Sequence, residues 1–215
     1  MANNSTELVF ILDKSGSMAG LEADTIGGFN ALLKKQKREA GEATVTTVLF
    51  NHDYELLHDR IPVKSVSPIT EKEYEVGGTT ALLDAIGSTI QKIGNAQKRT
   101  REEDRAGKVM FVITTDGMEN ASCEFNYQKI KTMIAAQKAK HNWEFIFMGA
   151  NIDAVKTAEE FGIDEDFAVN YHADEKGTEL NYKVMSETIT SFRKGEDLDR
   201  SWKKDIEKDF EKRKR

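Results

Sequence analysis

Three oxygen-bearing side chains follow the first apolar run of the chain. The run covers residues 8–12, and Asp13, Ser15 and Ser17 come directly after it, with Gly16 between the two serines. Carboxylate and hydroxyl oxygens without nearby imidazole or thiolate groups suit Mg²⁺, Mn²⁺ or Ca²⁺ rather than zinc. The alternative is that these residues only cap the helix expected from about residue 21 to residue 40. From this stretch alone, both interpretations stay open.

Two further stretches carry the same kind of side chain. A loop with the sequence Gly-Gly-Thr-Thr at residues 77–80 precedes a predicted helix, and Asp116 follows the apolar run of residues 109–113. The carboxyl ends of parallel strands share one edge of a sheet, which we call the crest, and ligands usually bind there. We therefore expect Asp13, Asp116 and at least three hydroxyl groups to meet at the crest.

The elements that must position these residues alternate between strands and helices. Apolar runs at residues 7–13, 109–114 and 143–148 predict buried parallel strands, and helical patterns follow each of them. Residues 43–50 and 54–63 predict a hairpin, which adds one antiparallel strand at the sheet edge. The expected fold class is α/β: a doubly wound, mostly parallel central sheet with helices on both faces, as in Rossmann-like folds.

The chain length of 215 residues fits one domain with an appended tail. We place the domain at residues 1–196 and a charged helical tail at residues 197–215. In the tail, Leu198, Trp202, Ile206 and Phe210 are spaced four apart and form a narrow apolar stripe on a helix. We expect this stripe to pack on the domain, and the alternative is a helix that binds a partner.

Composition limits the classes of function. The net charge of −6 argues against nucleic acid as a partner. The single cysteine, Cys123, leaves no internal disulfide and no cysteine-rich zinc site. The sequence shows neither a secretion signal nor an apolar run long enough to span a bilayer, so we expect a cytoplasmic protein without a membrane partner.

The chemistry-bearing stretches resemble the motifs of the von Willebrand factor type A domain, also called the integrin I-type domain. Residues 13–17, Asp-Lys-Ser-Gly-Ser, are similar to the DxSxS motif of that family, residues 78–86 to its threonine loop, and residues 114–117 to its TDG motif. The resemblance covers residues 6–170, in the family's order. It is greatest to small stand-alone bacterial or phage members.

The resemblance implies a metal-ion-dependent adhesion site. Ser15 and Ser17 would bind Mg²⁺, or Mn²⁺ or Ca²⁺ in its place, and Thr80 would bind it directly or through water. Asp13 and Asp116 would bind the ion or orient its waters. The offsets to the following helix favour Thr80 as the ligand, and the neighbouring Thr79 is the alternative. The ion would then capture an acidic side chain of a partner protein.

Three functions remain open at this stage. The leading one is a binding module without catalysis, and the rivals are a Mg²⁺-dependent phosphohydrolase and a scaffold subunit with a structural metal. No phosphate-binding GxxxxGK[ST] loop is present, and no histidine is expected near the crest as a general base. Ser15 also stands where a haloacid-dehalogenase-type phosphatase would have its second aspartate. We expect Glu119, Asn120 and Asp84 to have structural roles.

Overall fold

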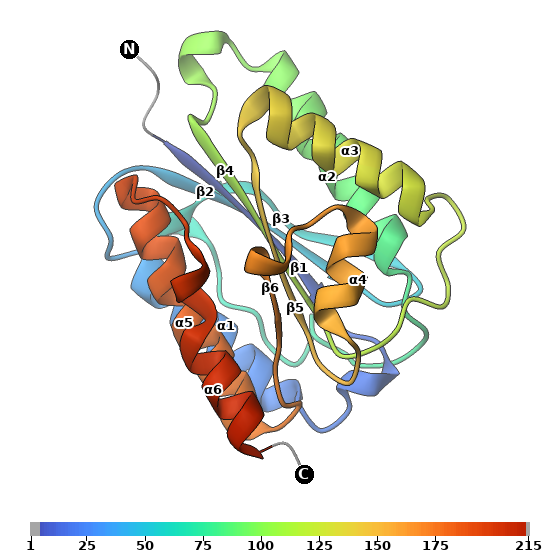
Figure 1. Ribbon diagram of the computed structural model, residues 1–215. Helices are drawn as coiled ribbons and strands as arrows, with labels where there is room; N and C mark the ends of the chain where they lie inside the picture. Colours follow the sequence, from blue (N-terminus) through green and yellow to red (C-terminus); the bar gives the residue numbers. More distant parts are fainter. Residues whose placement is uncertain (1–4, 214–215) are drawn as a thin grey trace.

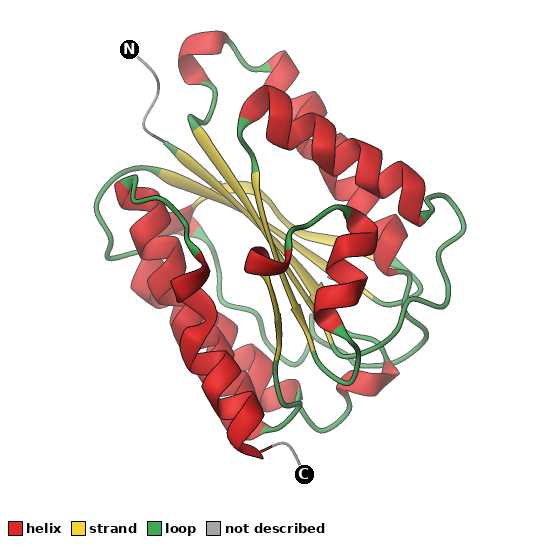
Figure 2. Ribbon diagram, viewed as in Figure 1, coloured by secondary structure: helices red, strands yellow, loops and turns green. Residues whose placement is uncertain are grey.

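The computed structural model describes residues 5–213, so the ends of the predicted domain and tail, residues 1–4 and 214–215, lie outside it. Six strands form one sheet, which separates two layers of helices (Figures 1 and 2). The strands are β1 (Thr6–Asp13), β2 (Ala43–Phe50), β3 (Tyr54–Pro62), β4 (Lys108–Thr115), β5 (Glu144–Gly149) and β6 (Ala168–Asn170). The α-helices are α1 (Glu22–Gln36), α2 (Leu82–Arg99), α3 (Tyr127–His141), α4 (Ala154–Phe161), α5 (Glu175–Lys194) and α6 (Lys204–Arg213).

The sheet has the strand order β3-β2-β1-β4-β5-β6. All neighbouring strands are parallel except β2 and β3, which form the predicted antiparallel hairpin at one edge. The predicted fold class is therefore confirmed. The register places Asp13 beside Phe50 and Leu12 beside Thr114, so β1, β2 and β4 end at the same level. This shared level is the crest.

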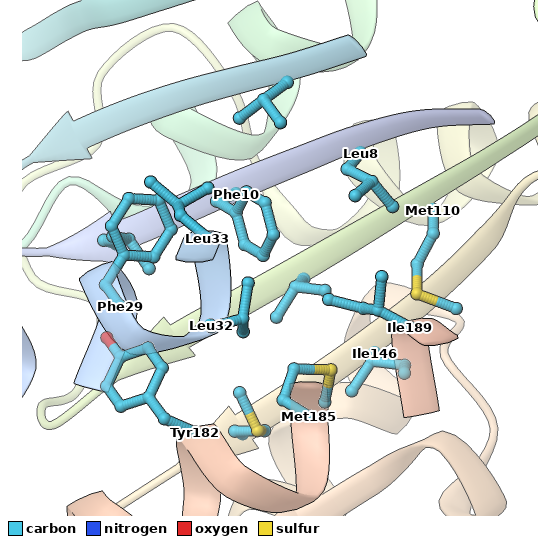
Figure 3. Close-up of a cluster of buried hydrophobic side chains, with 14 of the residues drawn as sticks. Leu8, Phe10, Phe29, Leu32, Leu33, Met110, Ile146, Tyr182, Met185 and Ile189 are labelled. Atoms are coloured by element: carbon cyan, nitrogen blue, oxygen red, sulfur yellow. The ribbon is translucent and has the colours of Figure 1, made fainter. Parts of the chain in front are cut away.

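Side chains of β1 alternate between two cores, because successive residues of a strand point to opposite faces. Leu8 and Phe10 face the layer of α1, α5 and α6, where Figure 3 shows them near Leu33, Met110 and Ile189. Val9 and Ile11 face the layer of α2, α3 and α4. Burial on both sides explains why the central strands read as continuous apolar runs.

Helix α1 ends at Gln36, four residues before the predicted end at residue 40. The buried guanidinium of Arg193 in α5 donates to the carbonyl oxygens of Gln36 (2.7 Å) and Gly41 (3.0 Å). These bonds satisfy carbonyl oxygens at and after the end of α1, where the helix itself offers no N–H donor. A residue more than 150 positions away thus stabilises the end of α1.

The tail packs on the domain through a short 3₁₀ helix (Arg200–Lys203) and α6. Ile206 is 2% exposed, and the indole N–H of Trp202 donates to Asp166 O (2.9 Å). The ammonium of Lys203, also buried, donates to Glu165 O and Ala168 O, beside β6. Leu198, the first residue of the predicted stripe, precedes the helical part of the tail.

Within residues 5–213, no helix combines the length and the apolar character that crossing a bilayer requires.

Candidate metal-binding site

Asp13 ends β1 and is almost fully buried. Its Oδ1 accepts the backbone N–H of Ser15 (2.7 Å), and its Oδ2 accepts the hydroxyl of Thr115 (2.6 Å). Burial raises the pKa of Asp13, and the bonds from Ser15 and Thr115 oppose that rise. This carboxylate therefore joins the loop after β1 to the end of β4.

The two serines stand on a 3₁₀ turn, Gly16–Met18, that begins directly after Ser15. Ser15 is 1% exposed, whereas Ser17 is exposed to solvent. Their hydroxyl oxygens lie 3.1 Å apart. One hydroxyl thus forms the floor of the site and the other its rim.

The threonine loop lies against the loop after β1. Gly16 N–H donates to Gly78 O (3.0 Å), and Gly77 N–H donates to Lys14 O (2.9 Å). Gly78 has a φ of +79°, a conformation that strongly favours glycine. In this loop Thr80 is 3% exposed, whereas Thr79 is exposed to solvent.

The glycine after Asp116 is a point of convergence. A Cβ added at Gly117 would lie 2.9 Å from Ser17 Oγ and 3.5 Å from Thr80 Oγ1. The hydroxyls of Ser17 and Thr80 therefore lie close to the backbone of the loop after β4, with no side chain at Gly117 between them. The three sequence stretches that were predicted to meet at the crest are therefore neighbours in the structure.

Asp116 is 2% exposed and follows the last residue of β4. Its pKa is raised to about 6, mainly by burial; a hydrogen bond from Asn151 lowers the pKa, and the nearby charge of Asp13 raises it. The amide of Asn151 donates to Asp116 Oδ1. Sequence reasoning missed Asn151, although it follows β5 at the same crest and has a φ of +56°.

The charge balance of this cluster favours a cation. Among residues 5–213, neither Asp13 nor Asp116 forms an ion pair, and the adjacent Lys14 is paired with Glu55. Buried carboxylates normally pair with a cation or bind a metal ion. No three acidic, histidine or cysteine side chains within the described residues group as metal ligands would, so a cation at this position would also need hydroxyl oxygens as ligands. Such oxygen-only sets fit Mg²⁺.

The residues expected to be structural do hold the loops. Asn120 Oδ1 accepts the N–H of Thr80 (2.9 Å), and Glu119 Oε2 accepts the N–H of Leu83 (3.0 Å) at the start of α2. Asp84 accepts three backbone N–H groups, those of residues 123–125. These bonds attach the loop after β4 to the threonine loop.

One expectation was wrong: a histidine does lie at the crest. The ring of His52 stands over the threonine loop, where a Cβ added at Gly78 would lie 2.2 Å from His52 Nδ1. The hairpin turn that carries His52 ends β2 at the crest, a position that the residue spacing alone did not indicate.

No family model and no curated protein sequence matches the chain. Solved structures do match it. A von Willebrand factor type A protein from Catenulispora acidiphila aligns over 87% of the chain with a TM-score of 0.59 and 14% identity. The chain has a von Willebrand factor type A fold. The ArnB paralog VWA2 from Sulfolobus acidocaldarius aligns over 85% with a TM-score of 0.55 and 18% identity.

The von Willebrand factor type A fold of this chain also resembles a mutant of the PilB minor pilin from Streptococcus sanguinis. That alignment covers 86% of the chain with a TM-score of 0.54 and 12% identity. The chain spans 44%, 43% and 61% of the VWA2, Catenulispora and pilin structures, respectively. At identities this low the similarity shows the fold alone. The activity has to be argued from the site.

Proposed function

We propose that this chain is a metal-dependent protein-binding domain without catalytic activity of its own. The hydroxyls of Ser15, Ser17 and Thr80 hold Mg²⁺, and the carboxylates of Asp13 and Asp116 hold the ion or its waters. The observation that carries this proposal is the pair of buried carboxylates that form no ion pair with any described residue, next to three converging hydroxyls. A divalent cation would neutralise that pair.

The partner is a protein that presents an acidic side chain. A divalent ion held by neutral hydroxyls supplies positive charge and replaceable water positions to an incoming carboxylate. Ser17 and Thr79 are exposed on this surface and can contact the partner beside the ion. Met118, two residues after Asp116, has 73% of its surface exposed and offers an apolar contact there.

The hydrogen bonds of Asp13 disfavour the rival hydrolase. An aspartate nucleophile needs a free carboxylate oxygen facing the substrate, whereas both oxygens of Asp13 accept hydrogen bonds from Ser15 and Thr115. His52 is the one group at the crest that favours base chemistry, and its ring lies beside Asp53 (3.4 Å). An assay with phosphate esters in Mg²⁺ tests this directly, and turnover lost in His52→Ala would replace our proposal.

The first test uses the ion alone. Titration calorimetry and thermal melting of the chain in Mg²⁺ and Mn²⁺ should show binding and a higher melting temperature, because an ion that binds only the folded state stabilises it. Asp116→Ala should abolish both effects. Asp53→Ala, which removes an exposed carboxylate on the same side of the sheet, is the matched control. No response of the wild type to either ion would contradict the proposal.

The second test concerns the partner. Proteins captured in Mg²⁺ and released by EDTA are identified, and the purified pair is titrated in both buffers. We expect binding only with the ion, and a large loss when one acidic residue of the partner is changed to its amide, because charge-assisted contacts are about twice as strong as neutral ones. Equal affinity in Mg²⁺ and EDTA would exclude the mechanism.

A further inference from the structure

A small cavity lies directly beneath the crest, on the side of the sheet that α1 and α5 cover. Residues of β1, β4, α1 and α5 line it, together with Tyr74 and Tyr171 from two loops. The space open to the centre of a water molecule is about 10 Å³. One water molecule needs roughly that volume, so the cavity holds one and not several.

The polar atoms around this cavity lack partners. Eight side-chain polar atoms of the described residues are buried without a hydrogen bond, and five of them belong to residues that line this one cavity. They are Thr25 Oγ1, Thr114 Oγ1, Thr178 Oγ1, Asn181 Oδ1 and Tyr182 OH. Each residue is at most 7% exposed. Leaving a buried polar atom unsatisfied costs about 1–3 kcal/mol, so a dry cavity with this lining is unfavourable.

We infer that the cavity is an internal hydration site, in which one ordered water molecule bridges β4 and α5. A water molecule donates two hydrogen bonds and accepts two, which matches the four unpartnered atoms of Thr114, Thr178, Asn181 and Tyr182. The hydroxyl of Thr25 lies beside the phenol of Tyr74 instead. Asn181 Oδ1 can only accept, and the three hydroxyls adapt their direction to the water.

Water fits this lining better than a metal ion. Asp13 is the one carboxylate among the described residues that line the cavity. The remaining groups are neutral, and hydroxyls that must also donate a proton gain more from water than from a cation. An apolar occupant would leave the same four atoms unsatisfied.

This water supports the floor of the crest. Tyr74, on the wall of the same cavity, donates its phenolic hydrogen to the backbone carbonyl of Asp13. Thr114 lies opposite Leu12, the residue before Asp13, across the β1–β4 ladder. The hydration site therefore connects the first two turns of α5 to the strand ends that carry the candidate metal-binding residues.

A high-resolution crystal structure of the whole chain tests this inference. We expect one isolated density peak in the cavity, within about 2.7–3.2 Å of at least three of the four atoms. Two outcomes would overturn the inference: a cavity without density, or side chains turned so that the hydroxyls bond to one another and close the space.

A pair of substitutions gives an independent measurement. Thr114→Val combined with Thr178→Val removes two partners of the water while keeping the side-chain shape. If the water is present, the double variant should melt several degrees below the wild type and show no peak in the cavity. A rise in melting temperature would indicate a dry cavity, because removing unsatisfied hydroxyls is stabilising. Thr188→Val is the control, since that α5 hydroxyl bonds to Val184 O instead.

Discussion

The side-chain amide of Asn151 donates a hydrogen bond to Asp116 Oδ1, so the loop after β5 orients the carboxylate at the end of β4. This contact crosses 35 residues of sequence and has no counterpart in the three motifs. The bond fixes one oxygen of Asp116 and thereby also sets the direction of the other oxygen.

Asn151→Gly should weaken Mg²⁺ binding by about 10–100-fold, the usual effect of removing a group that orients a metal ligand. Glycine keeps the positive φ of residue 151 without strain, so only the amide is lost. Asn142→Gly is the matched control, because Asn142 has a similar φ of +50° at the end of α3, far from the crest. Calorimetric titration of both variants measures the difference, and equal affinities would contradict the orienting role.

Thr80→Ala should weaken Mg²⁺ and partner binding more than Thr79→Ala. The Thr80 side chain is buried beside Gly117 and Ser17, whereas Thr79 is exposed to solvent. The two single variants remove the same atoms from adjacent positions, so each serves as the control of the other. The reverse order in a titration would mean that Thr79 holds the ion.

Gly117→Ala should reduce metal affinity through a single added methyl group. That Cβ would lie 2.9 Å from Ser17 Oγ, so the serine hydroxyl must move away from the site. Gly27→Ala is the control, because a Cβ there meets nothing within 4 Å and α1 gains about 0.5–1 kcal/mol of helix propensity. Unchanged Mg²⁺ affinity in Gly117→Ala would show that Ser17 is not a ligand.

Ile206→Ala should lower the free energy of unfolding by about 2–5 kcal/mol, the usual cost of truncating a buried isoleucine. Urea denaturation of the whole chain measures it. Lys212→Ala, at an exposed position of the same helix, should change stability by less than about 0.5 kcal/mol. A loss of partner binding in Ile206→Ala at unchanged stability would favour the alternative in which α6 binds a partner.

Stability should fall with acidification below pH 6.5 in part through His58. Burial lowers the pKa of His58 below the usual histidine value of 6.5, and its Nδ1 lies 3.0 Å from Thr47 Oγ1. Between the folded-state pKa and 6.5 the unfolded chain binds the proton and the folded chain does not, so protonation favours unfolding as the pH falls. Urea denaturation at several pH values in this window should show that the free energy of unfolding depends less on pH in His58→Gln than in the wild type. Exposed His141→Gln should keep the wild-type slope.

Local patterns predicted the fold because both faces of β1 and β4 are buried, which makes their sequences continuously apolar. The meeting of Asp13 and Asp116 at the crest followed from parallel pairing. Asn151 and His52 were missed because loop conformation, not periodicity, brings them there. The end of α1 was misplaced because its contact with the distant Arg193 leaves no local sequence pattern. Which residues bind an ion stays a prediction.

The contact of Lys203 with Ala168 O bears on how the chain behaves at high concentration. β6 is three residues long and forms the outer edge of the sheet. Unpaired strand edges can recruit strands of other molecules and start aggregation. The buried ammonium of Lys203 holds the tail beside β6. The tail therefore hinders other strands from pairing with this edge. Loss of the tail would therefore promote self-association of the chain before it unfolds.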